Sequence, residues 1–182
     1  GAGDAAERIT TYGYDGDKLH WVADAGGFQR LYRYDIAGRQ VADYYLRSRS
    51  DGTAAAPSFE GILTSRDALG RVVEQWAARH VAGANWADDG PRTVTSYNAH
   101  GDVTSVAIGG IAQQQNSYDG AGRLTATNSG DGVWKHFGYD ANGNQTIAIA
   151  SAGASLAGLS FTQALALVGQ EDVNATYTQY DA

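Results

Sequence analysis

The chain has 182 residues, which is enough for one domain with its own core or for two small ones. Its net charge of -7 argues against binding to nucleic acid or to an anionic membrane, because both partners attract a positive surface. Cysteine is absent, which excludes disulfide scaffolds, thiolate metal sites and cysteine nucleophiles. Glycine is frequent (24 residues) and proline rare (2), while tyrosine (11) outnumbers phenylalanine (4). This composition favours short strands joined by glycine turns over a helical bundle.

A repeated turn sequence runs along most of the chain. Five eight-residue segments align without a gap and approximate the pattern Tyr-Asp-x-x-Gly-Arg followed by two strand residues. They begin at Tyr34, Arg66, Tyr97, Tyr118 and Tyr139. Partial copies begin at Tyr14 and Tyr180. The basic period is about 20 residues, and such a period indicates one supersecondary unit repeated along the chain.

The pattern Asp-x-x-Gly is typical of a type I turn that is closed by a glycine in the left-handed conformation. A three-residue hairpin loop of this kind places the aspartate opposite the residue after the glycine. In one unit, Asp119 is therefore predicted to face Arg123, and Tyr118 to face Leu124. Each such cross-strand pair contributes about 0.2–1 kcal/mol.

The first unit is one residue shorter than the others. A two-residue loop formed by Gly16 and Asp17, with glycine first as a type II′ turn requires, keeps the same pairing. Asp15 then faces Lys18, and Tyr14 faces Leu19. The shorter unit is thus predicted to be a hairpin of the same kind.

The structural anchors of the repeat are the residues that open the turns, the glycines that close them and the arginines that face the aspartates. They are Tyr14, Asp15, Tyr34, Asp35, Gly38, Arg39, Asp67, Gly70, Arg71, Tyr97, Gly101, Tyr118, Asp119, Gly122, Arg123, Tyr139, Asp140, Gly143, Tyr180 and Asp181. The closing glycines of the five full units are predicted to have positive φ.

This pattern resembles the YD repeat of the RHS family, which includes bacterial polymorphic toxins, cocoon components of ABC-type toxin complexes and teneurin-like shells. The resemblance covers the chain from Tyr14 to Asp181. It implies an all-β fold of tandem antiparallel β-hairpins that form a spiralling, shell-like sheet around a polypeptide. The motif at which toxin members of the family cut themselves is absent from this sequence, so the resemblance implies no autoproteolytic site here.

We expect residues 1–182 to form a single array of about seven repeats, excised from a longer chain. Insertions at 48–65, 85–92 and 147–175 lengthen three of the units. The first is predicted to be an extended loop, and the second a loop. In the third, a capping box at Ser160 and Gln163, apolar residues at helical spacing and a following Gly169 predict one short helix near 160–168 that packs on the sheet.

Residues that could carry chemistry have a simpler explanation in each case. The histidines share no metal-ligand spacing; they are His20, His80, His100 and His136. Asp140–Asn144 begins like a calcium loop, but the glycine and the bidentate glutamate of such a loop are missing from their positions. Asp88 and Asp89 lie near Trp86 and are interpreted as a solvated turn. We therefore expect no catalytic residue, no metal and no cofactor, and the protein is predicted not to be an enzyme.

The segment Ile147–Gly169 is uncharged and long enough to span a bilayer. It is rich in alanine and lacks aromatic or basic anchors at its ends, so no membrane span is predicted.

Two hypotheses follow for function. The first is a structural segment of a β-shell in a large secreted or surface bacterial protein, with flanking repeats as partners and an enclosed polypeptide such as a toxin as cargo. The second is a cell-surface adhesin or carbohydrate-binding module that binds a glycan or another cell surface through exposed tyrosines and tryptophans. The tryptophans are Trp21, Trp76, Trp86 and Trp134.

Overall fold

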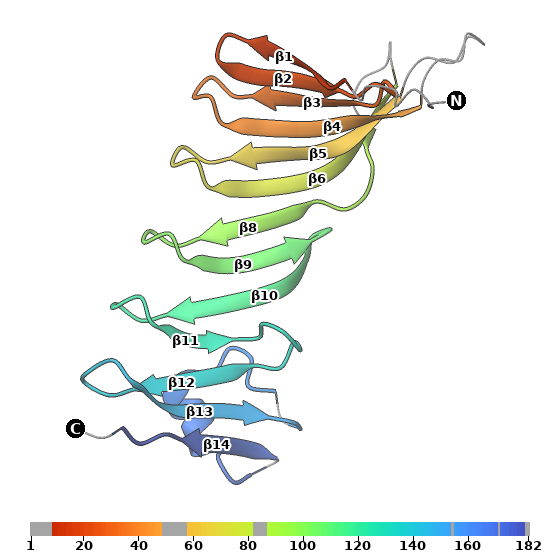
Figure 1. Cartoon of the computed structure of the whole chain (residues 1–182). Coiled ribbons are helices and arrows are strands. Elements are labelled where there is room, and N and C mark those ends of the chain that lie inside the picture. Colours follow the sequence, from red (N-terminus) through yellow and green to blue (C-terminus); the bar gives the residue numbers. More distant parts are fainter. Residues whose placement is uncertain (1–8, 49–57, 82–86, 154, 171, 181–182) are drawn as a thin grey trace, which may run out of the picture. The chain divides into compact units, whose positions relative to one another are not determined.

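The computed structural model describes residues 9–48, 58–81, 87–153, 155–170 and 172–180 (Figure 1). Over these residues the fold is an antiparallel sheet of 14 strands with one short helix. The predicted all-β fold of tandem hairpins is thereby confirmed. The chain divides into two compact units, Gly1–Thr93 and Val94–Ala182.

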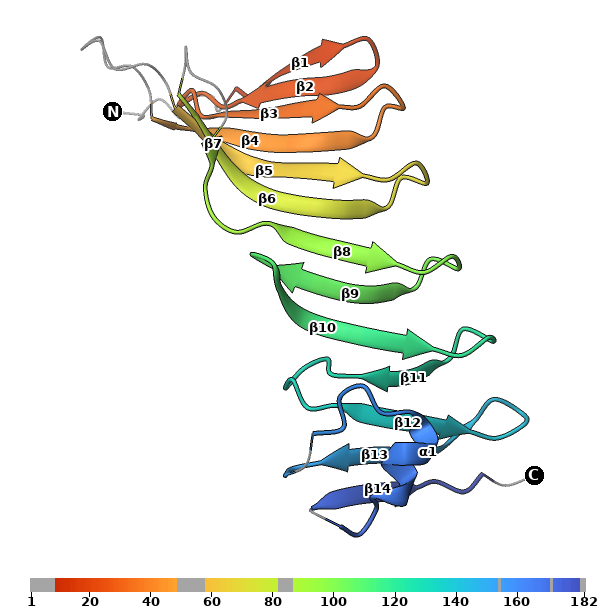
Figure 2. The same cartoon turned by 180° about the vertical axis from the view of Figure 1, so that it is seen from behind.

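The first unit holds hairpins whose strands lie side by side in sequence order (Figures 1 and 2). Its strands are β1 (Thr11–Asp15), β2 (Lys18–Ala23), β3 (Gln29–Tyr34), β4 (Gln40–Ser48), β5 (Ser58–Arg66), β6 (Val72–Val81) and β7 (Ala87–Asp88). The short β7 pairs with β6 and lies off the main strand order.

The second unit continues the pattern in its own strands. They are β8 (Thr93–Tyr97), β9 (Val103–Ile108), β10 (Ile111–Tyr118), β11 (Leu124–Thr127), β12 (Lys135–Tyr139), β13 (Gln145–Ser151) and β14 (Val173–Tyr177). The helix α1 (Phe161–Ala166) lies over the strands β12 and β13 (Figure 2).

The predicted turns are confirmed at 15–18, 35–39, 67–71, 98–102, 119–123 and 140–144. In each five-residue turn the first residue donates its backbone N–H to the carbonyl of the fifth, and the glycine donates back to the first, at 2.9–3.2 Å. The closing glycines have φ between +77° (Gly38) and +100° (Gly101), as predicted. Gly16 has φ +61°, and the predicted pairs of the short first hairpin are present in its register.

A β-bulge follows each of these turns where the register is defined, and the sequence did not predict it. In the β10–β11 hairpin Tyr118 pairs with Leu124 but Ser117 pairs with Ala126, so Thr125 is skipped. The same shift occurs at Gly13/Tyr14, Arg33/Tyr34, Ser65/Arg66 and Gly138/Tyr139. A bulge bends its strand and increases the local right-handed twist. Each repeat therefore contributes twist as well as two strands.

The loop predicted at 48–65 is wrong for its second part, because residues 58–65 belong to β5. Leu63 lies between Ala42 of β4 and Trp76 of β6, so apolar neighbours on both sides hold this segment in the sheet. Residues 49–57 lie outside the described part of the chain. In the predicted loop at 85–92, Ala87 and Asp88 pair with β6 instead of forming a free turn, and residues 85 and 86 are not described.

The sheet of the first unit has one apolar face. We define the apolar face by the cross-strand row Trp21, Leu31, Tyr44, Gly61 and Ala78 and the residues that share its side, such as Leu63. Large side chains in this row lie next to small ones, as in an interdigitated core, and Tyr44 and Ala78 are buried. Among the described residues of this unit, no helix covers this face.

The helix of the second unit builds a local core. Its predicted capping box is present, since the Ser160 hydroxyl accepts from the Gln163 N–H and the Gln163 side chain accepts from the Ser160 N–H. Its buried Ala164 packs together with the buried Ile149, Leu156 and Val173. This confirms the prediction that the helix packs on the sheet. No helix within the described ranges is long and apolar enough to cross a membrane.

Candidate functional site

Within each compact unit, the turn anchors of neighbouring hairpins contact one another. We call these anchors the turn ladder: the Tyr (or Arg66), Asp, Gly and Arg (or Lys18) positions of the hairpins. Within one turn, Asp119 Oδ1 accepts hydrogen bonds from the backbone N–H groups of Ala121 and Arg123, both at 2.9 Å. Its Oδ2 accepts from Arg123 Nε at 2.7 Å. The carboxylate therefore fixes both the turn backbone and the facing side chain.

The same ion pair closes two turns of the first unit. Asp35 and Arg39 pair at 2.8 Å, and Asp67 and Arg71 pair at 2.7 Å. These contacts confirm the predicted cross-strand charge pairs. They are partly exposed, so the free energy that each ion pair contributes is small.

Two turns that lack the standard pair keep its geometry with other donors. In the 98–102 turn, the Asn98 amide donates to the Asp102 carboxylate at 2.9 Å. The first position is here the donor and the fifth the acceptor, the reverse of the standard pair. In the 140–144 turn, Asn144 donates its amide to Asp140 at 3.0 Å. Asp140 Oδ1 also accepts from the N–H groups of Asn142 and Asn144, so the calcium-like segment is a capped turn.

The tyrosines of three repeats link their hairpin to the preceding one. The hydroxyl of Tyr34 donates to the carbonyl of Leu19 at 3.0 Å. Tyr118 donates in the same way to Val103 at 3.0 Å, and Tyr139 to Leu124 at 2.8 Å. In each case the accepting carbonyl belongs to the preceding repeat, at the strand position that faces the first anchor of that repeat. The repeated tyrosine thus sets the spacing between hairpins.

One unit has arginine in place of this tyrosine and keeps the link. Arg66 donates from Nε and Nη2 to the carbonyl of Gln40, both at 3.3 Å. Gln40 pairs with Tyr34 and is the equivalent acceptor of its own repeat. This position therefore requires a side chain that reaches the preceding hairpin and donates a hydrogen bond to its carbonyl.

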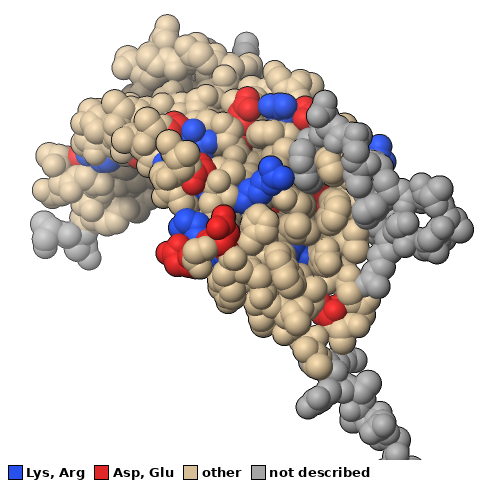
Figure 3. Space-filling view, turned by 90° about the horizontal axis from the view of Figure 1, so that it is seen from above, with Lys and Arg blue, Asp and Glu red and all other residues tan. Residues whose placement is uncertain are grey.

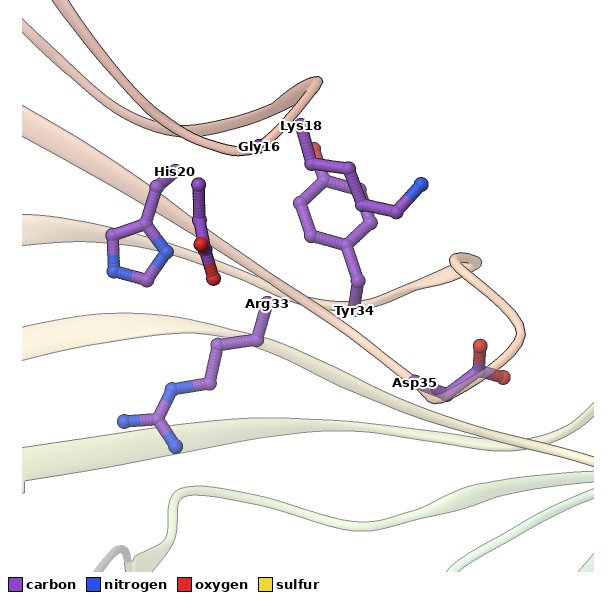
Figure 4. Close-up of a pocket in the computed structure, with 7 residues that line it drawn as sticks. Gly16, Lys18, His20, Arg33, Tyr34 and Asp35 are labelled. Carbon is purple, nitrogen blue, oxygen red and sulfur yellow. The ribbon is translucent and has the colours of Figure 1, made fainter.

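The cations of three turns, Lys18, Arg39 and Arg123, extend over the following hairpin. Lys18 lies 5.5 Å from the ring centroid of Tyr34, and Figure 4 shows its side chain running along that ring. Arg123 lies 4.8 Å from the Tyr139 ring centroid. A Cβ added to Gly70 would come within 2.6 Å of Arg39 Nη1. At Gly70 the closing glycine therefore provides positive φ and also leaves room for the cation of the preceding turn.

A cavity of about 460 Å³ lies between the first two turns (Figure 4). It is lined by Asp15, Gly16, Lys18, His20, Arg33, Tyr34 and Asp35. Arg33 points away from the Tyr34 ring and donates its Nε to the Tyr44 hydroxyl at 3.0 Å. Within the described part of the chain, no group of three or more histidine, aspartate and glutamate side chains could hold a metal ion.

Charged side chains do not gather by sign on the surface seen in Figure 3. Lysine and arginine lie there next to aspartate and glutamate. Arg92, for example, bridges Asp88 at 3.0 Å and Glu74 at 3.1 Å. Asp88, which the sequence suggested to be a solvated turn residue, therefore holds this arginine.

The three described tryptophans are half-buried, whereas the second hypothesis assumed that they are exposed. The Trp21 indole occupies the space above Gly13, where a side chain would collide with it. Trp76 lies beneath the Arg92 guanidinium, 4.3 Å from its ring centroid. Trp134 packs against the core cluster of the second unit. Trp86 lies outside the described residues.

Sequence reasoning missed two functional contacts. The link between hairpins was signalled by the anchor itself, which is tyrosine in most repeats and phenylalanine in none. A ring needed only for packing would tolerate phenylalanine, so the hydroxyl has a role of its own. The second is His136, a fully buried side chain whose Nε2 lies 3.1 Å from the Leu156 carbonyl and donates to it.

Replacing Tyr139 with phenylalanine should lower the free energy of unfolding by about 0.5–1.5 kcal/mol, because the Leu124 carbonyl loses its donor. The ring and its contact with Arg123 remain. Urea unfolding followed by circular dichroism measures the effect. Tyr177→Phe is the matched control, since Tyr177 is 66% exposed, and it should change stability by less than about 0.5 kcal/mol. Equal effects of the two changes would contradict the link.

The turn carboxylates should make the free energy of unfolding depend on pH in the acidic range. Hydrogen bonds from the backbone N–H of Arg39 and of Arg123 hold the pKa of Asp35 and of Asp119 below the ordinary value of 3.8. The Asn144 side chain does the same for the pKa of Asp140. A pKa lowered by folding stabilises the fold above the unfolded-state value, and this stabilisation is lost as the pH falls through the folded-state value.

The urea midpoint should accordingly stay constant between about pH 7 and pH 5 and fall below about pH 4. Asp119→Asn, which removes one of these carboxylates, should reduce the size of the fall. A decline centred near pH 6 would instead indicate histidine titration and would contradict the role given to the aspartates.

Comparison with known proteins gives matches only among solved structures. No family model matches the chain, and no curated protein matches it. It is similar to a crystal structure of TcdB2-TccC3-Cdc42, with 15% identity and a TM-score of 0.41 over 93% of this chain and 10% of that one. It is also similar to TcdB2-TccC3-TEV, with 15% identity, a TM-score of 0.39 and coverage of 93% and 10%. A Photorhabdus luminescens Tc holotoxin pore gives 14% identity, a TM-score of 0.39 and coverage of 92% and 9%.

Proposed function

We propose that the chain is a structural segment of an RHS/YD-repeat β-shell in a large secreted or surface bacterial protein, and that the shell encloses a polypeptide such as a toxin. The turn ladder carries this proposal. Its repeated residues bond to their own turn and to the preceding hairpin, as Tyr139 does to Leu124. Catalysis needs different functional groups gathered at one site, whereas these residues have the same structural role in each repeat. We therefore propose no catalytic role and no cofactor.

The same contacts define how flanking repeats would join. A hairpin needs only a donor at its first anchor and a carbonyl at the equivalent position of its neighbour, as Tyr34 and Leu19 provide. Because these groups recur at each repeat, a sheet of this kind can be extended by adding units. Flanking repeats of the same protein are therefore the proposed partners.

The apolar face of the first unit is the surface that we propose to face the enclosed polypeptide. It presents Trp21, Leu31 and Leu63, which are only half-buried. Uncovered apolar surface of this kind marks a site of interaction. An unfolded polypeptide offers the apolar side chains that would cover it.

Binding of an unfolded polypeptide tests the enclosure. Reduced, carboxymethylated α-lactalbumin with a fluorescent label is titrated with the chain, and fluorescence anisotropy reports binding. We expect the wild type to bind and Leu31→Gln to weaken binding about 5- to 30-fold, because a leucine contact is worth about 1–2 kcal/mol. The matched control is Val22→Gln, which is next to this position in the sheet but on the opposite face, and which should leave binding unchanged.

Circular dichroism verifies that each variant is folded. If Leu31→Gln unfolds, Leu63→Gln on the same face replaces it. Failure of the wild type to bind, or an equal loss in Val22→Gln, would contradict enclosure by the apolar face.

A further inference from the structure

A segment of the chain itself lies on the sheet of the second unit and shows what this side of the sheet can bind. The segment that contains α1 lies over β12 and β13 (Figure 2). Its Leu156 belongs to one buried cluster with Ile149, and His136 Nε2 donates to the Leu156 carbonyl at 3.1 Å. The Phe161 ring lies over Gly138, where an added Cβ would come within 2.6 Å of it. Apolar contacts and one hydrogen bond to a backbone carbonyl thus hold a polypeptide on the sheet.

The apolar face of the first unit is the equivalent side of the sheet. Three residues before the first anchor stands His136 in the last full repeat, paired with Ile149, and Leu63 in the repeat of Arg66, paired with Trp76. The register shifts directly before the anchor in both hairpins, so the two pairs occupy the same place in their repeats. Among the described residues of the first unit, no helix lies over this side. Leu63 and Trp76 therefore present the surface that a polypeptide covers in the last repeat.

The indole of Trp76 contains a hydrogen-bond donor without an acceptor. Its Nε1 is buried and has no hydrogen-bond partner among the residues that the structure describes. An indole nitrogen can only donate, and leaving a buried donor without an acceptor lowers the stability of a fold. In the equivalent pair of the last repeat, the Leu156 carbonyl accepts from His136. A backbone carbonyl of a bound polypeptide would satisfy Trp76 in the same way.

An arginine at the surface covers this indole. The Arg92 guanidinium lies 4.3 Å from the centroid of the Trp76 ring and pairs with Asp88 and Glu74. The side chain of Arg92 is 42% exposed, and ion pairs at such exposed positions are weak. Little free energy is therefore needed to move the guanidinium away from the ring.

The charges of the apolar face favour an uncharged ligand. Away from the turns, the Lys, Arg, Asp and Glu residues that the strands place on this face are Arg33, Glu74 and Asp88. Arg92 adds a second positive charge beside them, so the two signs balance. The segment that covers the last repeat fits such a surface, because residues 155–170 include four leucines and three alanines and no charged residue.

We propose that the apolar face of the first unit binds an uncharged, leucine- and alanine-rich segment of the enclosed polypeptide. The segment displaces Arg92, and one of its backbone carbonyls accepts a hydrogen bond from Trp76 Nε1. This inference rests on the proposed function, because the same face is used. It adds the chemistry of the bound segment and the residue that recognises its backbone.

Fluorescence anisotropy with a labelled peptide tests the inference. The peptide has the sequence of residues 155–170 and is titrated with the full chain. We expect the wild type to bind. Trp76→Phe keeps an aromatic ring and removes the N–H, and it should weaken binding about 2- to 12-fold. The matched control is Trp21→Phe on the same face, which should weaken binding by less than about 2-fold because Trp76 is retained.

Replacing Arg92 should have the opposite effect. Arg92→Ala should strengthen binding about 2- to 5-fold, because the peptide no longer has to displace the guanidinium from the ring. The matched control is Arg30→Ala. Arg30 is likewise paired with a carboxylate and lies over a tyrosine ring, but it is on the opposite face, so its replacement should leave binding unchanged. Unchanged or weaker binding in Arg92→Ala would contradict the displacement.

A second peptide tests the preference for an uncharged segment. It carries Leu159→Glu and Leu165→Glu and should bind about 10-fold more weakly or worse, because carboxylates would have to be buried on the apolar face. Equal binding of the two peptides would overturn the stated chemistry. Circular dichroism establishes that each protein variant is folded, and Arg92→Ala still tests the inference if Trp76→Phe unfolds.

The outcomes separate this inference from the proposed function. If Leu31→Gln weakens the binding of carboxymethylated α-lactalbumin but Trp76→Phe leaves peptide binding unchanged, the inference is wrong and enclosure by the apolar face stands. Equal losses in Trp76→Phe and Trp21→Phe would also overturn it. If the wild type binds neither the peptide nor α-lactalbumin, both proposals are wrong.

Discussion

Replacing Ile149 with alanine is expected to lower the free energy of unfolding by about 2–5 kcal/mol. Ile149 is 0% exposed and sits in the cluster formed with Leu156, Ala164 and Val173. The smaller side chain removes buried methyl and methylene groups and leaves a cavity beneath the helix. Few other described side chains are so completely enclosed, so this core concentrates much of the apolar burial of its unit.

Urea unfolding followed by circular dichroism measures this loss, and fluorescence of Trp134, which packs on the cluster, reports the local change. The matched control is Ile108→Ala in β9, because Ile108 is 40% exposed. It should cost less than about 1 kcal/mol. A loss in Ile149→Ala no larger than that in the control would show that the cluster does not stabilise the fold.

Replacing Gly61 with alanine is expected to destabilise the first unit by about 1–3 kcal/mol or to prevent its folding. Gly61 lies in β5 opposite Tyr44. An added Cβ would collide with the backbone carbonyl of Asp43 and with the Cα and Cβ of Tyr44. Because these are backbone or backbone-proximal atoms, the strands themselves would have to move apart.

The matched control is Gly120→Ala, at a turn position where an added Cβ meets nothing within 4 Å and φ is not positive. That change should leave stability unaltered or raise it by about 0.4–1 kcal/mol, because alanine restricts the unfolded chain. Thermal unfolding of both variants by circular dichroism makes the comparison. Equal midpoints for the two would contradict the close approach of β4 and β5 at Gly61.

The sequence determined the local parts of this fold. Aspartate at the first position and glycine at the fourth specify a turn through contacts within five residues, as Asp119, Gly122 and Arg123 illustrate. The capping box at Ser160 is equally local. Such contacts depend on neighbouring residues alone, and a repeated pattern of them is sufficient to predict tandem hairpins.

The tertiary structure decided how each hairpin meets the next and what the aromatic residues do. The Tyr139 hydroxyl reaches a carbonyl of the preceding hairpin, and Trp76 is half-buried beneath Arg92. His136 is buried because the helix segment folds back over its strand. These outcomes depend on the register between strands and on the bulges that shift it. Both are set by packing among residues far apart in the chain, which a local pattern does not encode.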